Sequence, residues 1–227
     1  MTEFRYSGSD NLDIVALLEH YNGKILDWVR AGVAPGQRVL DFGAGKGHFC
    51  NRMDGYAVSA VEPDRTFHAR IACPAHATLA AAGGGFDLVY SLNVLEHIDD
   101  DAAVARGFWE CLKPGGRVRV FVPALPLLYT TMDERVGHVR RYRRGELIRL
   151  FERAGFVVDD CRYFDFLGFF ATLAYRMAGG SGTPSRLSAT AYDRFAFPVS
   201  FLLDRLSGGR ITGKNLILSA HKPEVPA

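Results

Sequence analysis

The sequence predicts an α/β protein with a mainly parallel sheet that helices cover on both faces. Short apolar segments alternate with segments whose apolar residues recur at helical spacing. A glycine-rich turn follows the first apolar strand, as in sheets that bind a ligand at their carboxyl ends. The length of 227 residues and the hydrophobic content of 48% suit one ordinary globular domain, which we expect to span residues 1–227.

The expected elements follow one another in a regular order. Residues 12–31 carry apolar side chains at helical spacing, and Pro35-Gly36 ends that section. We expect strands at 38–42, 56–61, 86–91, 117–122, 157–163 and 215–221, and helices at 65–71, 100–111 and 144–154. Turns are expected at Leu112–Gly116 and at Gly155-Phe156. Alternation of this kind implies a parallel sheet with helices on both faces.

About fifty residues before the last strand, 164–213, are more than such a sheet needs. Residues 164–177 are apolar nearly all round, and the linker GGSGTPS occupies 179–185. The next segment has an apolar helical stripe that consists of Tyr192, Phe195, Val199, Leu202, Leu203 and Leu206. Pro198 is expected to kink this segment or to start a new helix. We predict a helical cap that packs on the sheet; a homodimer contact, a lid and a surface for a lipid-linked acceptor are the alternatives.

Composition narrows the classes of function. The formal net charge of +2 argues against a nucleic-acid partner, because such proteins usually carry a strongly basic face. The four cysteines form no C-x-x-C pair and have no nearby histidine at metal spacing, so we expect neither a metal site nor a disulfide framework. The first residues lack the pattern of a secretory signal, and no segment offers about 20 uninterrupted apolar residues. We therefore expect a cytoplasmic protein without a transmembrane segment.

The segment from Val39 to Phe49, VLDFGAGKGHF, carries the clearest functional signal. A strand ends on Asp41, and glycines follow at positions 43, 45 and 47, before a helical stretch that we expect to open at His48. Because glycine has no Cβ, such a turn lets the backbone come close to a ligand. A second strand ends on Glu62, where the next strand of a βαβ unit would offer an acid to ribose hydroxyls. The pattern predicts a site for a nucleoside cofactor.

The glycine spacing separates the candidate cofactors. A nicotinamide site favours G-x-G-x-x-G, but His48 stands where the third glycine would be. A phosphate loop requires Ser or Thr after its lysine, whereas Gly47 follows Lys46. The carboxylate of Asp41 disfavours a diphosphate and favours a ligand with an ammonium and a sulfonium group. A nicotinamide-dependent oxidoreductase remains the enzymatic alternative, and a catalytically silent cofactor-binding partner protein the non-enzymatic one.

Four segments in order resemble the class I S-adenosylmethionine-dependent methyltransferases. VLDFGAGKGHF is similar to their motif I, VEPD (61–64) to the acidic motif after it, FDLVYSLNVLEHIDDD (86–101) to their central strand and its loop, and LKPGGRVRVFVPA (112–124) to the turn and strand that follow. The likeness covers residues 38–124 firmly, and flanking segments resemble a bacterial subgroup often found beside glycosyltransferases. It implies a Rossmann-like methyltransferase fold with a seven-stranded sheet, and S-adenosylmethionine as the cofactor.

The resemblance also implies roles for individual residues. The cofactor site would comprise Tyr21, Asp41, Phe42, Gly43, Ala44, Gly45, Glu62, Pro63, Asp64 and Asn93. Within it Asp41 would orient the amino group of the cofactor, directly or through water, and Glu62 would accept hydrogen bonds from the ribose. Asn93 would lie near the sulfonium. The acid that family members place before the central strand is absent here, so Thr78, His76 or backbone would replace it at the adenine.

Methyl transfer mainly requires in-line alignment and exclusion of water, and a base helps when the acceptor still holds its proton. We predict His97, His138 and Asp133 as catalytic candidates, and Tyr129, Arg141 and Tyr142 as acceptor-binding ones. His97, with an intrinsic pKa of about 6.5, suits general-base work, and packing against the cofactor is the equally weighted alternative. Arg141 suits an acceptor phosphate or carboxylate, whereas the alternative for the charged segment 129–144 is a solvated helix start.

The acceptor is predicted mainly by exclusion. The loop after the central strand reads Ser91-Leu-Asn-Val94 and lacks the Asn/Asp-Pro-Pro-aromatic tetrapeptide of nucleic-acid amino-methylases. We therefore predict O-methylation of a small hydroxylated molecule, such as a sugar, a glycolipid or a secondary metabolite, in preference to N- or C-methylation.

Overall fold

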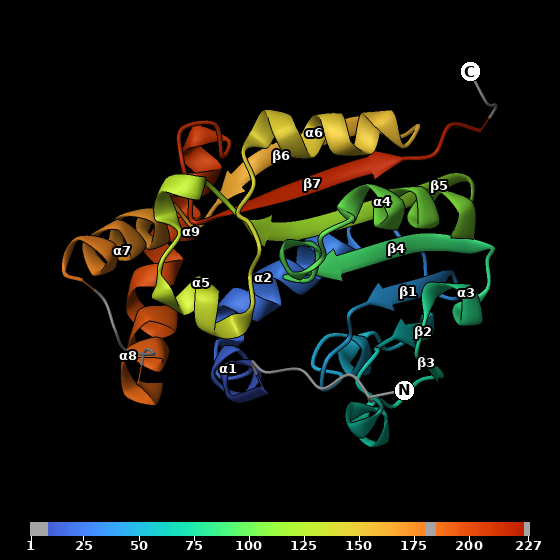
Figure 1. Ribbon diagram of the computed structural model, residues 1–227, viewed down its shortest axis with the longest axis horizontal. Coiled ribbons are helices and arrows are strands. Elements are labelled where there is room, and N and C mark those ends of the chain that lie inside the picture. The colour runs from blue at the N-terminus through green and yellow to red at the C-terminus, as the bar shows by residue number, and fades with distance from the viewer. Residues whose placement is uncertain (1–8, 180–184, 225–227) are drawn as a thin grey trace.

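A computed structural model describes residues 9–179 and 185–224, with side chains from residue 12 onward. Its centre is one sheet in the order β3-β2-β1-β4-β5-β7-β6 (Figure 1). The strands are β1 (Arg38–Phe42), β2 (Ala57–Val61), β3 (Ala75–His76), β4 (Phe86–Leu92), β5 (Leu112–Pro123), β6 (Val157–Phe164) and β7 (Asn215–His221). Strands β1 to β5 pair in parallel, and β7 runs antiparallel to both β5 and β6. The predicted seven-stranded, mainly parallel sheet is confirmed.

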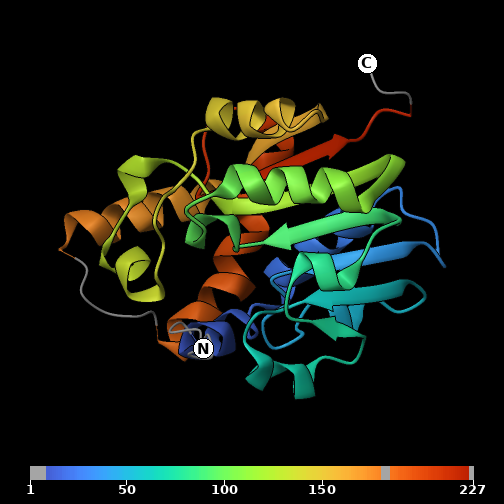
Figure 2. The same ribbon diagram turned by 45° about the vertical axis from the view of Figure 1, so that its right-hand side comes forward.

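Helices cover both faces of the sheet, as predicted (Figure 2). On one face α4 (Asp101–Cys111) and α6 (Arg144–Arg153) pack over Phe86, Val89 and the valines of β5. On the other face α2 (Glu19–Arg30) packs over Tyr90 and Phe121. Alternate side chains of β4 and β5 enter the two cores because successive residues of a strand point to opposite faces. Both cores lie beneath the carboxyl edge where the predicted site residues gather.

The first helical section consists of two helices where one was expected. Helix α1 (Ser9–Val15) ends three residues before α2 begins, and the chain turns between them. The side-chain amide of Asn22 donates to the carbonyl oxygen of Val15 at 2.7 Å, which ties the end of α1 back onto α2. This tie holds α1 against the glycine turn, because Leu12 lies 3.4 Å from where a Cβ on Gly45 would stand.

The expectation that a helix opens at His48 is wrong. The chain forms turns and then a single 3₁₀ turn, η1 (Cys50–Arg52). Gly47 adopts φ +81°, a left-handed conformation that interrupts a right-handed helix. The Asn51 side chain then bonds across to the segment before β3, donating to the carbonyl of Arg70 and accepting from the amide of Ala72. These contacts replace the hydrogen bonds that a longer helix would have made.

Two further local expectations need correction. Leu112–Gly116, expected as a turn, is extended and forms the start of β5, with a register shift where β4 pairs with it. Gly115 has φ +75° there, and its amide donates to the carbonyl of Lys222. The helix expected at 65–71 is the 3₁₀ helix η2 (Arg65–Arg70), which follows a side-chain cap from Asp64. Short β3 and α3 (Leu79–Ala82) have no counterpart among the expected elements.

The segment before β7 is helical, as predicted. It comprises α7 (Phe166–Met177), α8 (Arg186–Ala191), the π-helix η5 (Tyr192–Ala196) and α9 (Phe197–Ser207). Pro198 stands in the first turn of α9, so the expectation that it starts a new helix is confirmed. The expected linker at 179–185 lies mostly outside the described residues.

Of the six residues in the predicted apolar stripe, Tyr192 and Leu203 are half-buried, whereas Phe195, Val199, Leu202 and Leu206 are exposed. Helix α9 turns Phe197, Ser200 and Asp204 inward. The Asp204 carboxylate accepts from the backbone amides of Asp165 (2.7 Å) and Phe166 (3.1 Å), at the corner between β6 and α7. Polar anchors and the buried Phe197 ring together fix which side of α9 faces inward.

Candidate active site

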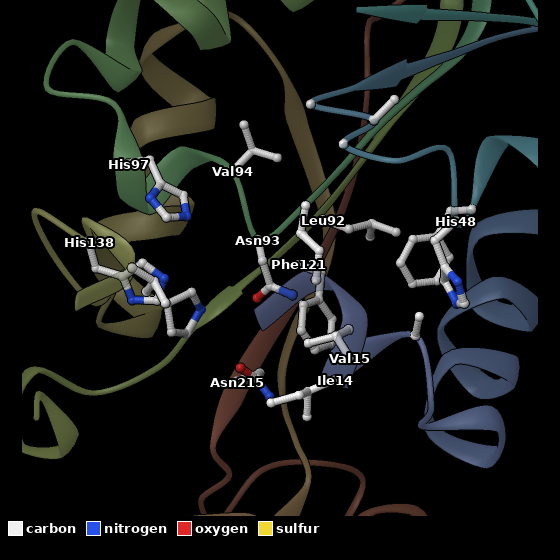
Figure 3. A pocket seen from close by; sticks show the side chains of 18 of the residues that line it. Ile14, Val15, His48, Leu92, Asn93, Val94, His97, Phe121, His138 and Asn215 are labelled. Atoms are coloured by element: carbon white, nitrogen blue, oxygen red, sulfur yellow. The ribbon is translucent and has the colours of Figure 1, made fainter. Parts of the chain in front are cut away.

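A cavity of about 1460 Å³ lies at the carboxyl edge of the parallel strands, between the sheet, helices α1 and α2, and the helices that follow β5 and β6. Twelve of the predicted site residues line it: Tyr21, Phe42, Gly43, Ala44, Gly45, Glu62, Pro63, Asn93, His97, Asp133, His138 and Arg141. The other four, Asp41, Asp64, Tyr129 and Tyr142, lie behind this lining. Figure 3 shows His97 and His138 on one side of the cavity and His48 on the other, with Asn93 between them.

The glycine turn and Glu62 form one wall of the cavity. Gly43 and Gly45 have φ of +82° and +53°, so the chain leaves β1 in a conformation that other residues rarely adopt. The amide of Gly45 donates to Glu62 Oε2 at 2.7 Å, and the amide of Asp64 donates to Oε1 at 2.8 Å. Burial raises the pKa of Glu62, and these two amides oppose the rise. The carboxylate is thus fixed at the end of β2 with lone pairs left for hydroxyl donors.

Asp41 and Asp64 support this wall from behind. Burial raises the pKa of Asp41 to about 7, and the nearby Glu62 carboxylate adds to the effect. The Asp64 side chain accepts from the amide and hydroxyl of Thr66, so it caps η2. A direct contact of Asp41 with a ligand is not favoured by this placement, whereas contact through water stays compatible with it.

Asn93 and Tyr21 border the middle of the cavity. Asn93 has φ +54° at the end of β4, a strained conformation for which asparagine is better suited than most residues. Its amide donates to the carbonyl of Phe121 at 2.8 Å, which fixes the bend. The Tyr21 hydroxyl accepts from the Asn215 side chain at 2.6 Å, and its ring centroid lies 4.7 Å from that of Phe197. Asn93 is therefore held through its backbone amide, and the Tyr21 side chain is held by Asn215 of β7 and Phe197 of α9.

A buried ionic network centred on Asp133 forms the opposite wall. Arg141 donates to both Asp133 oxygens, from Nε at 2.8 Å and from Nη2 at 2.9 Å. His138 Nδ1 lies 2.7 Å from Asp133 Oδ1, and the amide of Thr130 donates to Oδ2 at 2.8 Å. Burial opposes ionisation of Asp133, but the bonds from His138 and Arg141 and the charge of Arg141 hold its pKa well below its usual range. An ionised Asp133 only accepts, so Nδ1 of His138 carries the hydrogen and Nε2 has the lone pair of the neutral ring.

The second histidine packs against the first. The rings of His97 and His138 meet edge to face with centroids 4.7 Å apart. Nδ1 of His97 faces the carbonyl of Gly137 at 3.2 Å, so it too carries the hydrogen. Burial lowers the pKa of His97 to about 4, and the neighbouring His138 adds to the effect. His97 is therefore neutral and weakly basic near neutral pH.

Glu96 completes this cluster, although the sequence analysis did not select it as a site residue. Its side chain is fully buried, and neither carboxyl oxygen has a hydrogen-bond partner among the described residues. Burial raises its pKa to about 8, although the charge of Arg141 opposes the rise. Glu96 Oε1 lies 3.7 Å from His138 Nε2, and Glu96, His97 and His138 offer ligand atoms within 4.8 Å of one another. Such a set has the composition of a divalent-metal site, which sequence spacing did not predict.

Lys214 is the second residue that the sequence analysis missed. It precedes β7 and lines the cavity, with its backbone held by the carbonyl of Asp165 and the amide of Ala124. Burial lowers its pKa, and it forms no ion pair with any residue that the structure describes. A single lysine before a strand gives no signal in the sequence, because only the fold brings it to the cavity.

Three of the predicted acceptor-binding residues have structural partners instead. The hydroxyl of Tyr129 donates to the carbonyl of His138, and that of Tyr142 to the Asp101 carboxylate. The guanidinium of Arg141 lines the cavity, but its strong hydrogen bonds go to Asp133. Its charge is thereby balanced within the protein, which does not favour the expectation that it binds an acceptor anion.

Comparison with known proteins supplies the family. Residues 17–160 match the family described as a methyltransferase domain. The ubiquinone biosynthesis O-methyltransferase of Ralstonia nicotianae is 33% identical over 119 residues, which are 44% of this chain and 50% of that protein. The chain thus spans about half the length of the curated relatives it matches.

Solved structures share the fold. The S-adenosylmethionine dependent methyltransferase from Mesorhizobium loti has a TM-score of 0.58 and 19% identity, over 86% of this chain and 97% of that one. Phosphoethanolamine N-methyltransferase 2 of Haemonchus contortus, in complex with S-adenosyl-L-methionine, has a TM-score of 0.58 and 18% identity, over 92% of this chain and 56% of that one. At these identities the likeness concerns the fold.

The family match covers more than half of the chain, and the seven-stranded sheet agrees with it. This match favours S-adenosylmethionine over the nicotinamide alternative. The chain belongs to the methyltransferase-domain family, and its sheet has the fold of S-adenosylmethionine dependent methyltransferases of known structure.

Proposed function

We propose that this methyltransferase transfers the methyl group to a hydroxyl oxygen of a small acceptor, with His138 as the general base. One observation carries the proposal: His138 Nδ1 is held 2.7 Å from an ionised Asp133 on the cavity wall. This arrangement fixes the ring and leaves Nε2 to take a proton. Such a base is useful for a hydroxyl acceptor, which must lose its proton as the new bond forms.

The residues of the opposite wall fit S-adenosylmethionine. Gly43 and Gly45 leave room where a Cβ on Gly43 would collide with Val94, and Glu62 presents a buried carboxylate at the end of β2. Glu62 would hold the ribose hydroxyls, and Asn93 would lie beside the sulfonium. When bound, the cofactor supplies an electrophilic methyl group. The chain's own tasks are then to align the acceptor, to exclude water and to hold the proton.

The network around His138 supports distinct roles for its members. Asp133 is a positioning residue, because its pKa lies too low for it to take a proton near neutral pH. Arg141 balances the charge of Asp133 and fixes its orientation. His97 is the weaker candidate base because burial lowers its pKa to about 4. In this proposal His97 packs beside His138 and shields it from water.

The acceptor side of the cavity supports a hydroxylated molecule with an apolar part. Small and apolar residues from the helices before β7 line it, including Ala171, Thr172 and Ala189. Lys214 is the basic group there that would meet a polar substituent or the developing oxyanion of the acceptor. The names of the curated relatives, O-methyltransferases, support oxygen as the methylated atom.

Transfer of an isotope-labelled methyl group from the cofactor into a fractionated cell extract tests the proposal. We expect His138→Gln to lower the rate by about 10²–10⁴-fold, because a general base contributes that much, and to leave affinity for S-adenosylhomocysteine unchanged. His97→Gln is the matched control and should lower the rate far less. NMR of the labelled product identifies whether oxygen carries the methyl group.

Two results would contradict the proposed base. Equal losses in His138→Gln and His97→Gln would show that the pair acts as one unit. Loss of activity on chelation, restored by added Mg²⁺, would make Glu96, His97 and His138 metal ligands. A label found on nitrogen or carbon would refute the oxygen acceptor and leave the family assignment intact.

A further inference from the structure

Exposed apolar side chains concentrate in the helices before β7. Eight of the twelve large apolar residues exposed on the described surface belong to this segment: Phe170, Met177, Leu187, Phe195, Val199, Leu202, Leu206 and Ile211. The segment is less than a quarter of the chain, so the concentration is far above an even spread. Helices α7, α8 and α9 lie together at one end of the molecule (Figure 1). Gathered exposure of this kind marks an interaction surface.

Four of these residues form a continuous stripe on η5 and α9. Phe195, Val199, Leu202 and Leu206 recur at intervals of four, three and four residues, so they share one face of the helix. Their exposed fractions are 71%, 50%, 54% and 77%. The opposite face holds α9 on the sheet through Asp204, so rotating the helix to hide the stripe would break those hydrogen bonds.

The exposed charges of η5, α9 and the turn after α9 have one sign. Arg194, Arg205 and Arg210 are exposed, and none of them forms an ion pair with a described residue. The two acids of the same stretch, Asp193 and Asp204, are buried and accept backbone hydrogen bonds. The outward surface of η5 and α9 is therefore apolar and cationic, which is the pattern of helices that lie in the interface of an anionic membrane.

We propose that this surface, formed by Phe195, Val199, Leu202, Leu206 and the three arginines, docks the enzyme on an anionic phospholipid bilayer. The stripe would enter the headgroup region while the arginines contact lipid phosphates. No described helix is long and apolar enough to cross a membrane, so the contact is peripheral.

The charge distribution favours a bilayer over a second copy of the chain. In a two-fold dimer the same surface packs on itself, so arginines of one copy would face arginines of the other. No exposed acid on η5 or α9 is present to pair with them. A lipid surface has the negative charge that this side of the helix lacks.

The docking surface and the cavity share one helical layer. Gly168, Thr172 and Tyr175 of α7, Ser188 and Ala189 of α8, and Tyr192 line the cavity from inside. The same layer carries the exposed residues on its outside, so docking would hold the acceptor side of the cavity next to the bilayer. The inference does not depend on which acceptor is methylated or on whether His138 is the base.

Vesicle flotation of the full-length enzyme with S-adenosylhomocysteine bound tests the proposal. We expect the protein to float with vesicles of phosphatidylcholine and phosphatidylglycerol, and to remain below with phosphatidylcholine alone. The Leu202→Glu/Leu206→Glu double variant should lose at least about tenfold of the binding, because two apolar contacts are removed. Arg205→Gln should bind the anionic vesicles about fivefold more weakly, and the binding of the natural chain should weaken as salt is added.

Matched controls lie at the start of β6 and the end of α6, at the end of β6 away from α7. Val157→Glu and Arg153→Gln change an exposed apolar and an exposed basic residue there, and both variants should float like the natural chain. Unchanged thermal stabilisation by S-adenosylhomocysteine will show that each variant is folded. Equal flotation of Leu202→Glu/Leu206→Glu and the natural chain would overturn the proposal. So would absence of flotation together with a dimer in sedimentation that the double variant abolishes, since that result assigns the surface to a second copy.

Discussion

At the scale of single residues, Glu96 couples the site to the stability of the fold. Its carboxyl is fully buried beside His138, and burial raises its pKa to about 8. The same group in the unfolded chain has a pKa of about 4.5. Between these values the folded protein keeps a proton that the unfolded chain releases, so stability falls as pH rises. The stabilising contribution is complete below pH 4.5 and is lost by about pH 8.

We predict that Glu96→Gln removes this pH dependence. The free energy of unfolding of the natural chain should fall, relative to that of the variant, by about 1.4 kcal/mol for each pH unit between 5 and 8. Asp41 and Asp204 have pKa values raised to about 7 and about 6, but both proteins retain them, so they cancel in the difference. Urea unfolding of both proteins at several pH values measures this difference in unfolding free energy.

The control for this prediction is Glu110→Gln, which changes an exposed glutamate on α4. Its unfolding free energy should stay parallel to that of the natural chain at every pH. If Glu96→Gln also ran parallel, Glu96 would be ionised in the folded protein. A cation bound between Glu96, His97 and His138 would have that effect.

At this scale the sequence predicted which residues lie at the cavity better than it predicted what each of them does. It placed Glu62 and His138 on the cavity because each follows a strand whose carboxyl end meets the ligand. It named Asp133 as a catalytic candidate and Arg141 as an acceptor-binding one, yet the two bind each other. Pairing across eight residues depends on how the loop folds, and a linear sequence does not report it. Burial of Glu96 is hidden for the same reason.

At the scale of elements, the β1 turn is the most constrained piece of the site. Gly43 has φ +82°, and a Cβ built on it would stand 2.3 Å from Cγ2 of Val94. Two elements therefore meet there without space for a methyl group: the end of β1 and the loop after β4. Glycine at this position sets how closely the two strand ends approach and so shapes the floor of the cavity.

We predict that Gly43→Ala destabilises the protein more than Gly36→Ala does. Gly36 has nearly the same φ, +81°, but open space where the Cβ would be, so its substitution costs only the left-handed strain of roughly 1–2 kcal/mol. Gly43→Ala adds overpacking, worth about 1–3 kcal/mol more. Urea unfolding compares the two, and Val94→Ala introduced beside Gly43→Ala should restore part of the loss. Equal losses at the two glycines would mean that the loop after β4 yields freely.

Strands were easier to predict than the connections between them. Strands β1, β4 and β7 have nearly the expected bounds because buried strands of this kind are short apolar runs between turn signals. The start of β5 was missed because Pro-Gly-Gly is typical of a turn, whereas Leu112 pairs with Phe86 of β4 and the backbones of Gly115 and Gly116 bond to that of Lys222. Apolar periodicity did not separate the buried from the exposed face of α9, because Phe197 packs inward beside Ser200 and Asp204 while larger apolar residues face outward.

At the scale of the whole molecule, the helical layer before β7 is an insertion that the topology of the sheet does not require. Phe164 and Asn215, the end of β6 and the start of β7, are direct partners in the antiparallel ladder. A two-residue hairpin could therefore join them, and the intervening helices are an addition to one edge of the sheet. Contacts across the boundary are specific: Asp193 accepts from the amides of His20 and Tyr21, and Phe197 packs against Tyr21.

We predict that replacing 165–214 by Asn-Gly leaves a folded chain that binds S-adenosylhomocysteine but does not transfer methyl groups. Gly43, Gly45 and Glu62 belong to the β1–β2 side and stay in place, whereas the replacement removes Lys214 and the acceptor wall. Circular dichroism, calorimetry with S-adenosylhomocysteine and the transfer assay measure the three expectations. Affinity should fall by about tenfold, because Tyr21 loses Asp193 and Phe197 but keeps Asn215.

The full-length variant Phe197→Ala removes only the packing of this ring and leaves the rest of the helical layer before β7 in place. The Phe197 ring is buried among Tyr21, Phe164 and Phe201, so its removal should cost about 3–5 kcal/mol of unfolding free energy while the acceptor wall remains. If the shortened chain were unfolded while Phe197→Ala stayed folded, the layer would be an integral part of the domain. If the shortened chain bound S-adenosylhomocysteine and still transferred methyl groups, the acceptor would be held by the sheet side alone, and the role proposed for Lys214 would be wrong.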